Sequence, residues 1–104
     1  MDPLKDRQTA FETKYANDQD TLFRIEARAT KLLALWAAQE MGLEGDAAAT
    51  YAGDLVAFNL KEPGLNDVIA RVSADLAAKG RKADTVAQML SQFLKDAEAQ
   101  IRGQ

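Results

Sequence analysis

The chain has 104 residues, a net charge of −3 and neither Cys nor His. A chain of this length forms one domain. Without Cys or His it has no disulfide, thiol nucleophile, imidazole acid–base catalyst or ordinary zinc site. Its pI near 4.9 argues against a nucleic acid as partner, because phosphates are bound by basic surfaces.

The composition also indicates the fold class and the compartment. Twenty residues are Ala, the strongest helix former, whereas only four are Val and three are Ile. No apolar run approaches the roughly 20 residues of a transmembrane helix, and the first residues lack the apolar stretch of a secretory signal. We therefore expect an all-α protein that is cytoplasmic and not inserted in a membrane.

Apolar residues then recur at helical spacing in four successive segments. The first predicted helix covers residues 20–41 and is followed by Gly42, a residue typical of the position just after a helix. Its predicted apolar face comprises Leu22, Ile25, Ala29, Leu32, Leu33, Trp36 and Ala37. Two side chains depart from this pattern: Glu26 lies inside the apolar arc, and Leu35 lies roughly opposite it and is a candidate for a second contact surface.

Three further helices are predicted after Gly42. The second covers residues 46–61 with Asp46 as N-cap. The third covers 66–79 with Asn66 as N-cap, and Gly80 marks its end. The fourth, at 85–101, opens with a capping-box pattern from Thr85. Short connections between amphipathic helices favour an antiparallel four-helix bundle. The expected single core includes Leu33, Trp36, Leu55, Val72 and Phe93.

The first 18 residues differ from this bundle, and we treat residues 1–18 as an N-terminal arm and 19–104 as the four-helix bundle. Phe11 and Tyr15 fall within about 20° of the direction of Leu22 if one helix continues through them. Such a helix would extend well past the other three and leave both aromatic rings uncovered. The arm is then either a frayed, solvated terminus or a mobile, partly helical segment that orders on a partner.

Few residues are candidates for catalysis or for binding a metal ion or an anion. No catalytic group or metal site is expected. The acidic pairs Glu40/Glu44 and Asp18/Asp20 lack the polar support of a catalytic dyad, and Asp18-Gln19-Asp20 does not match a calcium loop. Lys79, Arg81 and Lys82 form a cationic turn between the third and fourth helices. Such residues complement the helix dipole, or they contact an anion or nucleotide weakly. We expect neither an enzyme nor a tightly bound cofactor.

The amino-acid sequence of the first predicted helix and its surroundings is distinctive. The characteristic elements are Asp6-Arg7, Ala10-Phe11-Glu12, Lys14, Asp18, Phe23, Glu26-Ala27-Arg28, Lys31-Leu32-Leu33, Leu35-Trp36-Ala37-Ala38, Glu40, Gly42-Leu43, Tyr51-Ala52, Asp67-Val68, Asp75-Leu76 and Lys79-Gly80. Over its whole length the chain resembles the zeta subunit of the alphaproteobacterial F-type ATP synthase, a family also described as a domain of unknown function.

This resemblance implies a four-helix bundle that inhibits ATP hydrolysis by the synthase. In the family, the N-terminal segment enters the catalytic sector at an interface of the alpha, beta and gamma subunits and opposes rotation in the direction of hydrolysis. Carried over by position, the inhibitory arm includes Leu4, Asp6, Arg7, Phe11, Glu12, Lys14 and Tyr15. The resemblance also implies a protein that is peripheral on the membrane-bound synthase, and we expect a monomer when it is free.

One position departs from the family, and two other functions stay open. Residue 17 is Asn where relatives often have His, so a pH switch based on that His cannot operate in this chain. The first alternative function is a small helical module that binds a nucleotide or anion near the cationic turn. The second is a helical adaptor for some other protein.

Overall fold

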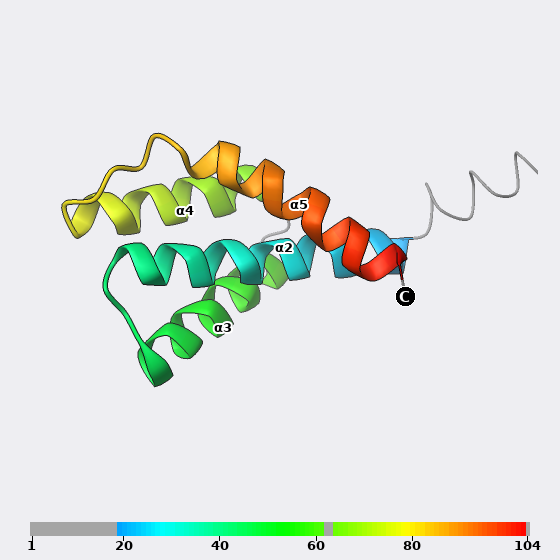
Figure 1. Ribbon diagram of the computed structural model, residues 1–104, viewed down its shortest axis with the longest axis horizontal. Helices are drawn as coiled ribbons and strands as arrows, with labels where there is room; N and C mark the ends of the chain where they lie inside the picture. Colours follow the sequence, from blue (N-terminus) through cyan, green and yellow to red (C-terminus); the bar gives the residue numbers. More distant parts are fainter. Residues whose placement is uncertain (1–18, 62–63, 104) are drawn as a thin grey trace, which may run out of the picture.

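Four helices make up the part of the chain that the computed structural model describes, residues 19–61 and 64–103. They are α2 (Gln19–Glu40), α3 (Gly45–Lys61), α4 (Leu65–Ala78) and α5 (Val86–Arg102), and these described residues contain no strand (Figure 1). The all-α prediction is confirmed, and each predicted helix end lies within one residue of the observed one. The predicted arm, residues 1–18, lies outside the described residues.

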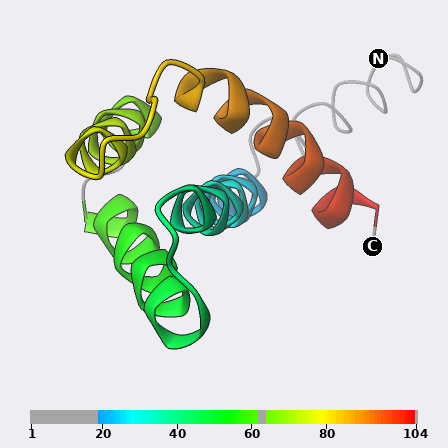
Figure 2. The same ribbon diagram turned by 60° about the vertical axis from the view of Figure 1, so that its left-hand side comes forward.

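Helix α2 is the central element of the bundle. It packs most extensively against α3 and α5, which lie on either side of it (Figure 2). Helix α4 contacts all three other helices, whereas α3 and α5 do not contact each other among the described residues. The bundle is therefore open along one side of α2, where no helix joins α3 to α5.

Two of the helices end as the glycine pattern predicts. After α2, Gly42 has a φ of 80°, the Leu43 N–H donates to the Ala38 carbonyl at 2.8 Å, and the Gly42 N–H donates to Gln39 at 3.0 Å. After α4, Gly80 has a φ of 73°, and the Arg81 N–H reaches the Leu76 carbonyl at 2.9 Å. Both ends are Schellman motifs, which satisfy the last carbonyls and reverse the chain.

The helix starts differ from the predicted caps. Helix α3 begins at Gly45, so Asp46 lies in its first turn, where its charge still complements the helix dipole. Gly64 is the N-cap of α4, and Asn66 lies inside the helix. Thr85 is the N-cap of α5 as predicted, but its side chain makes no capping hydrogen bond. The turns thus depend on glycine backbone freedom more than on side-chain caps, because Gly45 and Gly64 both adopt positive φ.

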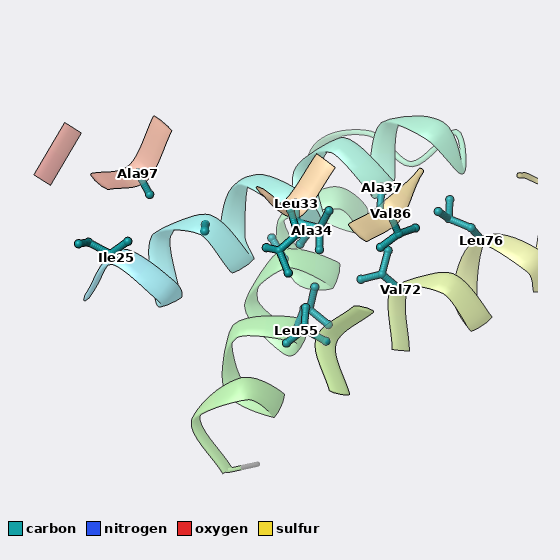
Figure 3. Close-up of a cluster of buried hydrophobic side chains, with 13 residues drawn as sticks. Ile25, Leu33, Ala34, Ala37, Leu55, Val72, Leu76, Val86 and Ala97 are labelled. Atoms are coloured by element: carbon teal, nitrogen blue, oxygen red, sulfur yellow. The ribbon is translucent and has the colours of Figure 1, made fainter. Parts of the chain in front are cut away.

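The core is built from branched side chains of all four helices around small residues of α2. Leu33, Leu55, Val72, Leu76 and Val86 are fully buried and lie close together (Figure 3). On α2 itself the fully buried apolar residues are Ala29, Leu33, Ala34, Ala37 and Ala38. Alanine side chains allow neighbouring helix axes to approach closely, which explains how one helix contacts three others.

The structure corrects several predicted core positions. Trp36 and Phe93 are only partly buried at the edge of the core, and Leu22 is 39% exposed. Thr30 is instead fully buried, together with the alanines Ala34 and Ala38. Because α2 has neighbours on three sides, its buried arc is wide and centred on small residues, and a bulky indole fits only at its margin. Leu33, Leu55 and Val72 are confirmed as core residues.

Candidate functional site

The predicted arm residues have no described geometry. Leu4, Asp6, Arg7, Phe11, Glu12, Lys14 and Tyr15 all lie outside the described residues. What the structure does describe is the start of α2, to which the arm leads. There Leu22 is 39% exposed and Phe23 is 50% exposed, so the helix begins with apolar surface that the bundle leaves uncovered.

The three cations of the predicted anion site lie at the turn between α4 and α5. Lys79 is the C-cap of α4, and Arg81 and Lys82 follow in the turn. All three are exposed, and none of them forms an ion pair with another described residue. Lys79 lines a neighbouring hollow whose walls do not include Arg81 or Lys82.

That hollow joins the α2–α3 turn to α4. It has a volume of about 380 Å³, and its walls include the apolar residues Met41 and Leu43 and the charged residues Arg71, Asp75 and Lys79. Two cations and one carboxylate leave a single net positive charge. Contact with an anion or nucleotide at this end of the bundle stays a prediction.

A polar cluster connects α3 to α4 at the wall of this hollow. The Tyr51 hydroxyl donates a hydrogen bond of 2.8 Å to Oδ2 of Asp75, and Nε of Arg71 lies 3.7 Å from the same oxygen. The Arg71 guanidinium also lies over the ring of Phe58, 5.0 Å from its centroid, at a distance typical of a cation–π contact. Arg71 of α4 thus contacts both a carboxylate of its own helix and an aromatic ring of α3.

The electrostatics of this cluster favour a structural role. Burial raises the pKa of Tyr51 strongly, the hydrogen bond and the negative charge of Asp75 raise it further, and the Arg71 charge opposes them. A phenol with a raised pKa keeps its proton and acts as a donor, whereas a catalytic base needs a group that gives the proton up near neutral pH. The arrangement therefore fixes α4 against α3.

Sequence reasoning did not identify this cluster as a unit. Tyr51 and Asp75 are 24 residues apart, and neither spacing nor residue type shows that they meet. The one available signal was that both belong to the elements that carry the family resemblance. Glu26, the predicted odd residue of α2, is half-buried, as expected of a residue at the rim of the bundle.

The described residues offer neither a metal site nor a transmembrane helix. Residues 19–61 and 64–103 hold no group of three Asp or Glu side chains that would bind a metal ion. No helix among them is long and apolar enough to cross a membrane.

Comparison with known proteins places the chain in a family. The model of the family described as ATPase inhibitor subunit zeta matches residues 1–100, which include the predicted arm and all four helices except the last two residues of α5. No curated protein and no solved structure gives a significant match. The resemblance seen in the sequence is thus confirmed for nearly the whole chain, and the chain belongs to the ATPase inhibitor subunit zeta family.

Proposed function

We propose that this protein inhibits ATP hydrolysis by the F-type ATP synthase, and that residues 1–18 are the inhibitory segment. The observation that carries the proposal is the family match over residues 1–100, because it spans the arm as well as the bundle. Membership of this family indicates a regulatory, non-catalytic protein that associates with the synthase. The proposed binding site for the arm is an interface of the alpha, beta and gamma subunits.

The exposed start of α2 supports this role for the arm. If the helix continues toward the N-terminus, Phe11 and Tyr15 extend the line of Leu22, which is itself 39% exposed. A continuous apolar stripe would then leave the bundle at its uncovered end. Such a stripe suits insertion as a helix into an apolar groove of a partner.

The energetics suit a removable block. A short helix without tertiary contacts is marginal in water, so the arm is expected to gain most of its order on the synthase. Ordering costs about 1–2 kcal/mol per backbone residue, and burial of the two aromatic rings offsets part of it. The folded bundle stays outside the interface, and a segment that enters between the rotor and the catalytic subunits opposes rotation. We place the protein at the cytoplasmic face of the membrane-bound synthase, as a monomer when free.

Truncation and substitution of the full chain test this function. Removal of residues 1–18 should abolish inhibition of ATP hydrolysis by purified synthase while the thermal melt of the bundle is retained. The double variant Phe11→Ala/Tyr15→Ala should weaken inhibition by about 2–4 kcal/mol in binding free energy if both rings are central anchors. The matched control is Leu60→Ala, which removes an exposed apolar side chain on α3. Full inhibition by the double variant would refute the proposed role of the arm.

A further inference from the structure

The side of α2 that lies between α3 and α5 forms a trough. Two adjoining hollows run along it and share Lys31 of α2 and Val56 of α3. One extends toward Ile101 of α5 and the other toward Ala49 of α3, and no residue of α4 lines either. Since α3 and α5 do not contact each other, nothing among the described residues closes this side of the bundle (Figure 2).

The floor of the trough is apolar. Leu35 is 39% exposed although it is a large apolar residue, and it lies in the second hollow beside Ala52 and Gly53. The small residues of α3 keep this part of the trough wide. The helical pattern placed Leu35 opposite the apolar face of its helix, and in the structure Leu35 lines the hollow between α2 and α3.

The rim of the trough is cationic. Arg24, Arg28 and Lys31 line the first hollow, and no acidic residue lines either hollow among the described residues. None of the three forms an ion pair with another residue that the structure describes, and Arg28 donates to the neutral Gln100 amide oxygen at 2.8 Å. Arg24 and Arg28 are four residues apart on one helix, a spacing at which like charges destabilise the helix. A partner that brings carboxylates would remove this repulsion.

The spacing of these side chains fits a helical partner. At 100° per residue, Arg24, Arg28, Lys31 and Leu35 fall within an arc of about 60°, and they extend along about 16 Å of α2. A trough of this length accepts about three turns of another helix. The partner that complements an apolar floor and cationic residues on the same face is a helix with an apolar stripe flanked by acidic residues.

We propose that this trough docks an acidic amphipathic helix from a partner protein. Apolar side chains of that helix would lie on Leu35 and Val56, and its carboxylates would pair with Arg24, Arg28 and Lys31. A second copy of the chain is a poor occupant of the trough, because it would bring the same three cations face to face. The inference goes beyond the proposed inhibitory function, since it concerns the bundle and does not require the arm.

A designed peptide tests the proposal on the full chain. The probe is an 18-residue helical peptide with leucines at i, i+4, i+7 and i+11 and glutamates beside them. Titrated into isotope-labelled protein, it should shift amide resonances in residues 24–35 and 49–56. The same peptide with lysine in place of glutamate should bind at least about tenfold more weakly, and added salt should weaken the acidic peptide.

Matched variants then assign the binding to the trough. Lys31→Glu and Leu35→Ser should each weaken peptide binding by about tenfold or more. Two control variants lie outside the trough: Lys95→Glu makes the same charge change on an exposed residue of α5, and Leu60→Ser removes another exposed leucine. The affinity of each control variant for the peptide should stay within about twofold of that of the unchanged chain.

Several results would overturn the proposal. These are amide shifts centred elsewhere, equal binding of the lysine peptide, or equal losses in the two control variants. Binding to phosphatidylserine vesicles without binding to the peptide would assign the surface to a membrane instead. If Phe11→Ala/Tyr15→Ala alone altered the resonances of residues 24–35, the chain's own arm would be the occupant.

Discussion

The two ends of α2 lie in very different surroundings. Toward its C-terminus, α4 runs alongside it (Figure 1), and Leu33 is enclosed by branched residues of the three other helices. We call this the packed end. Toward Gln19, α2 extends beyond α4, because its 22 residues make a helix of about 33 Å against about 21 Å for the 14 residues of α4. We call this the open end.

The open end retains only part of a core. Ile25 is 6% exposed and lies near Ala97 of α5 at one end of the core cluster (Figure 3), whereas Leu22 and Phe23 are 39% and 50% exposed. The helical pattern of the sequence is equally strong at both ends. Amphipathic periodicity therefore shows that a face is apolar but does not show what covers it. Leu22 and Phe23, two of the exposed large apolar residues, lie next in sequence to the proposed inhibitory arm.

The largest expected difference between the ends comes from truncation of leucines. Leu33→Ala should lower the free energy of unfolding by about 3–4 kcal/mol, because it leaves a cavity at the packed end. Leu22→Ala should cost less than about 1 kcal/mol, because that side chain is already in contact with water. Chemical denaturation of both variants gives the values. Equal losses would mean that the open end is as well packed as the other.

Truncation of Trp36 tests where the core of the packed end stops. If Trp36 were a fully buried core residue, Trp36→Ala would lower the free energy of unfolding by about 3–5 kcal/mol. Since the structure places it at the edge of the core, partly buried, we expect Trp36→Ala to cost about 1–2 kcal/mol. Its intrinsic fluorescence should also be quenched by acrylamide more readily than that of a buried indole. A loss above about 3 kcal/mol would return Trp36 to the core.

Tyr51 tests the polar contact that holds α4 in place at the packed end. Tyr51→Phe removes the donor to Asp75 and should cost about 1 kcal/mol at neutral pH. The pKa of Tyr51 is raised above its ordinary value of 10.0, so the folded protein keeps a proton that the unfolded chain releases. The stability from this contact is thus full below about pH 10 and is lost as the pH rises further.

Denaturation of the unchanged chain and of Tyr51→Phe at several pH values measures this dependence. The difference in unfolding free energy between them should be constant from about pH 7 to 9 and shrink above about pH 10. Asp75→Asn is the matched control, because it keeps an acceptor for the hydroxyl but removes the charge. A difference that does not change with pH would mean that the phenol is not held protonated by the fold.

The elements were predictable from the sequence because their signals are local. Gly42 and Gly80 end helices through backbone conformations that glycine favours, and these positions were identified correctly. The contact between Tyr51 and Asp75 was not predictable, since it depends on how two helices pack. Burial of Thr30 was missed for a related reason: polarity argued for the surface, but a helix with neighbours on three sides buries whatever side chain faces them.

Substitution of Thr30 should give the smallest change in unfolding free energy, and this change should be an increase. Thr30 is fully buried on α2, and its hydroxyl oxygen has no hydrogen-bond partner in the described part of the chain. Thr30→Val keeps the branched shape and removes a buried polar group that is unpaired, so it should raise the unfolding free energy by about 0.5–1 kcal/mol. Thr50→Val, on the exposed surface of α3, is the matched control and should change stability by less than about 0.5 kcal/mol. Thermal melts of the two variants decide the matter. A loss of stability in Thr30→Val alone would mean that the hydroxyl has a partner in solution, such as a bound water, and that the wide buried arc of α2 depends on it.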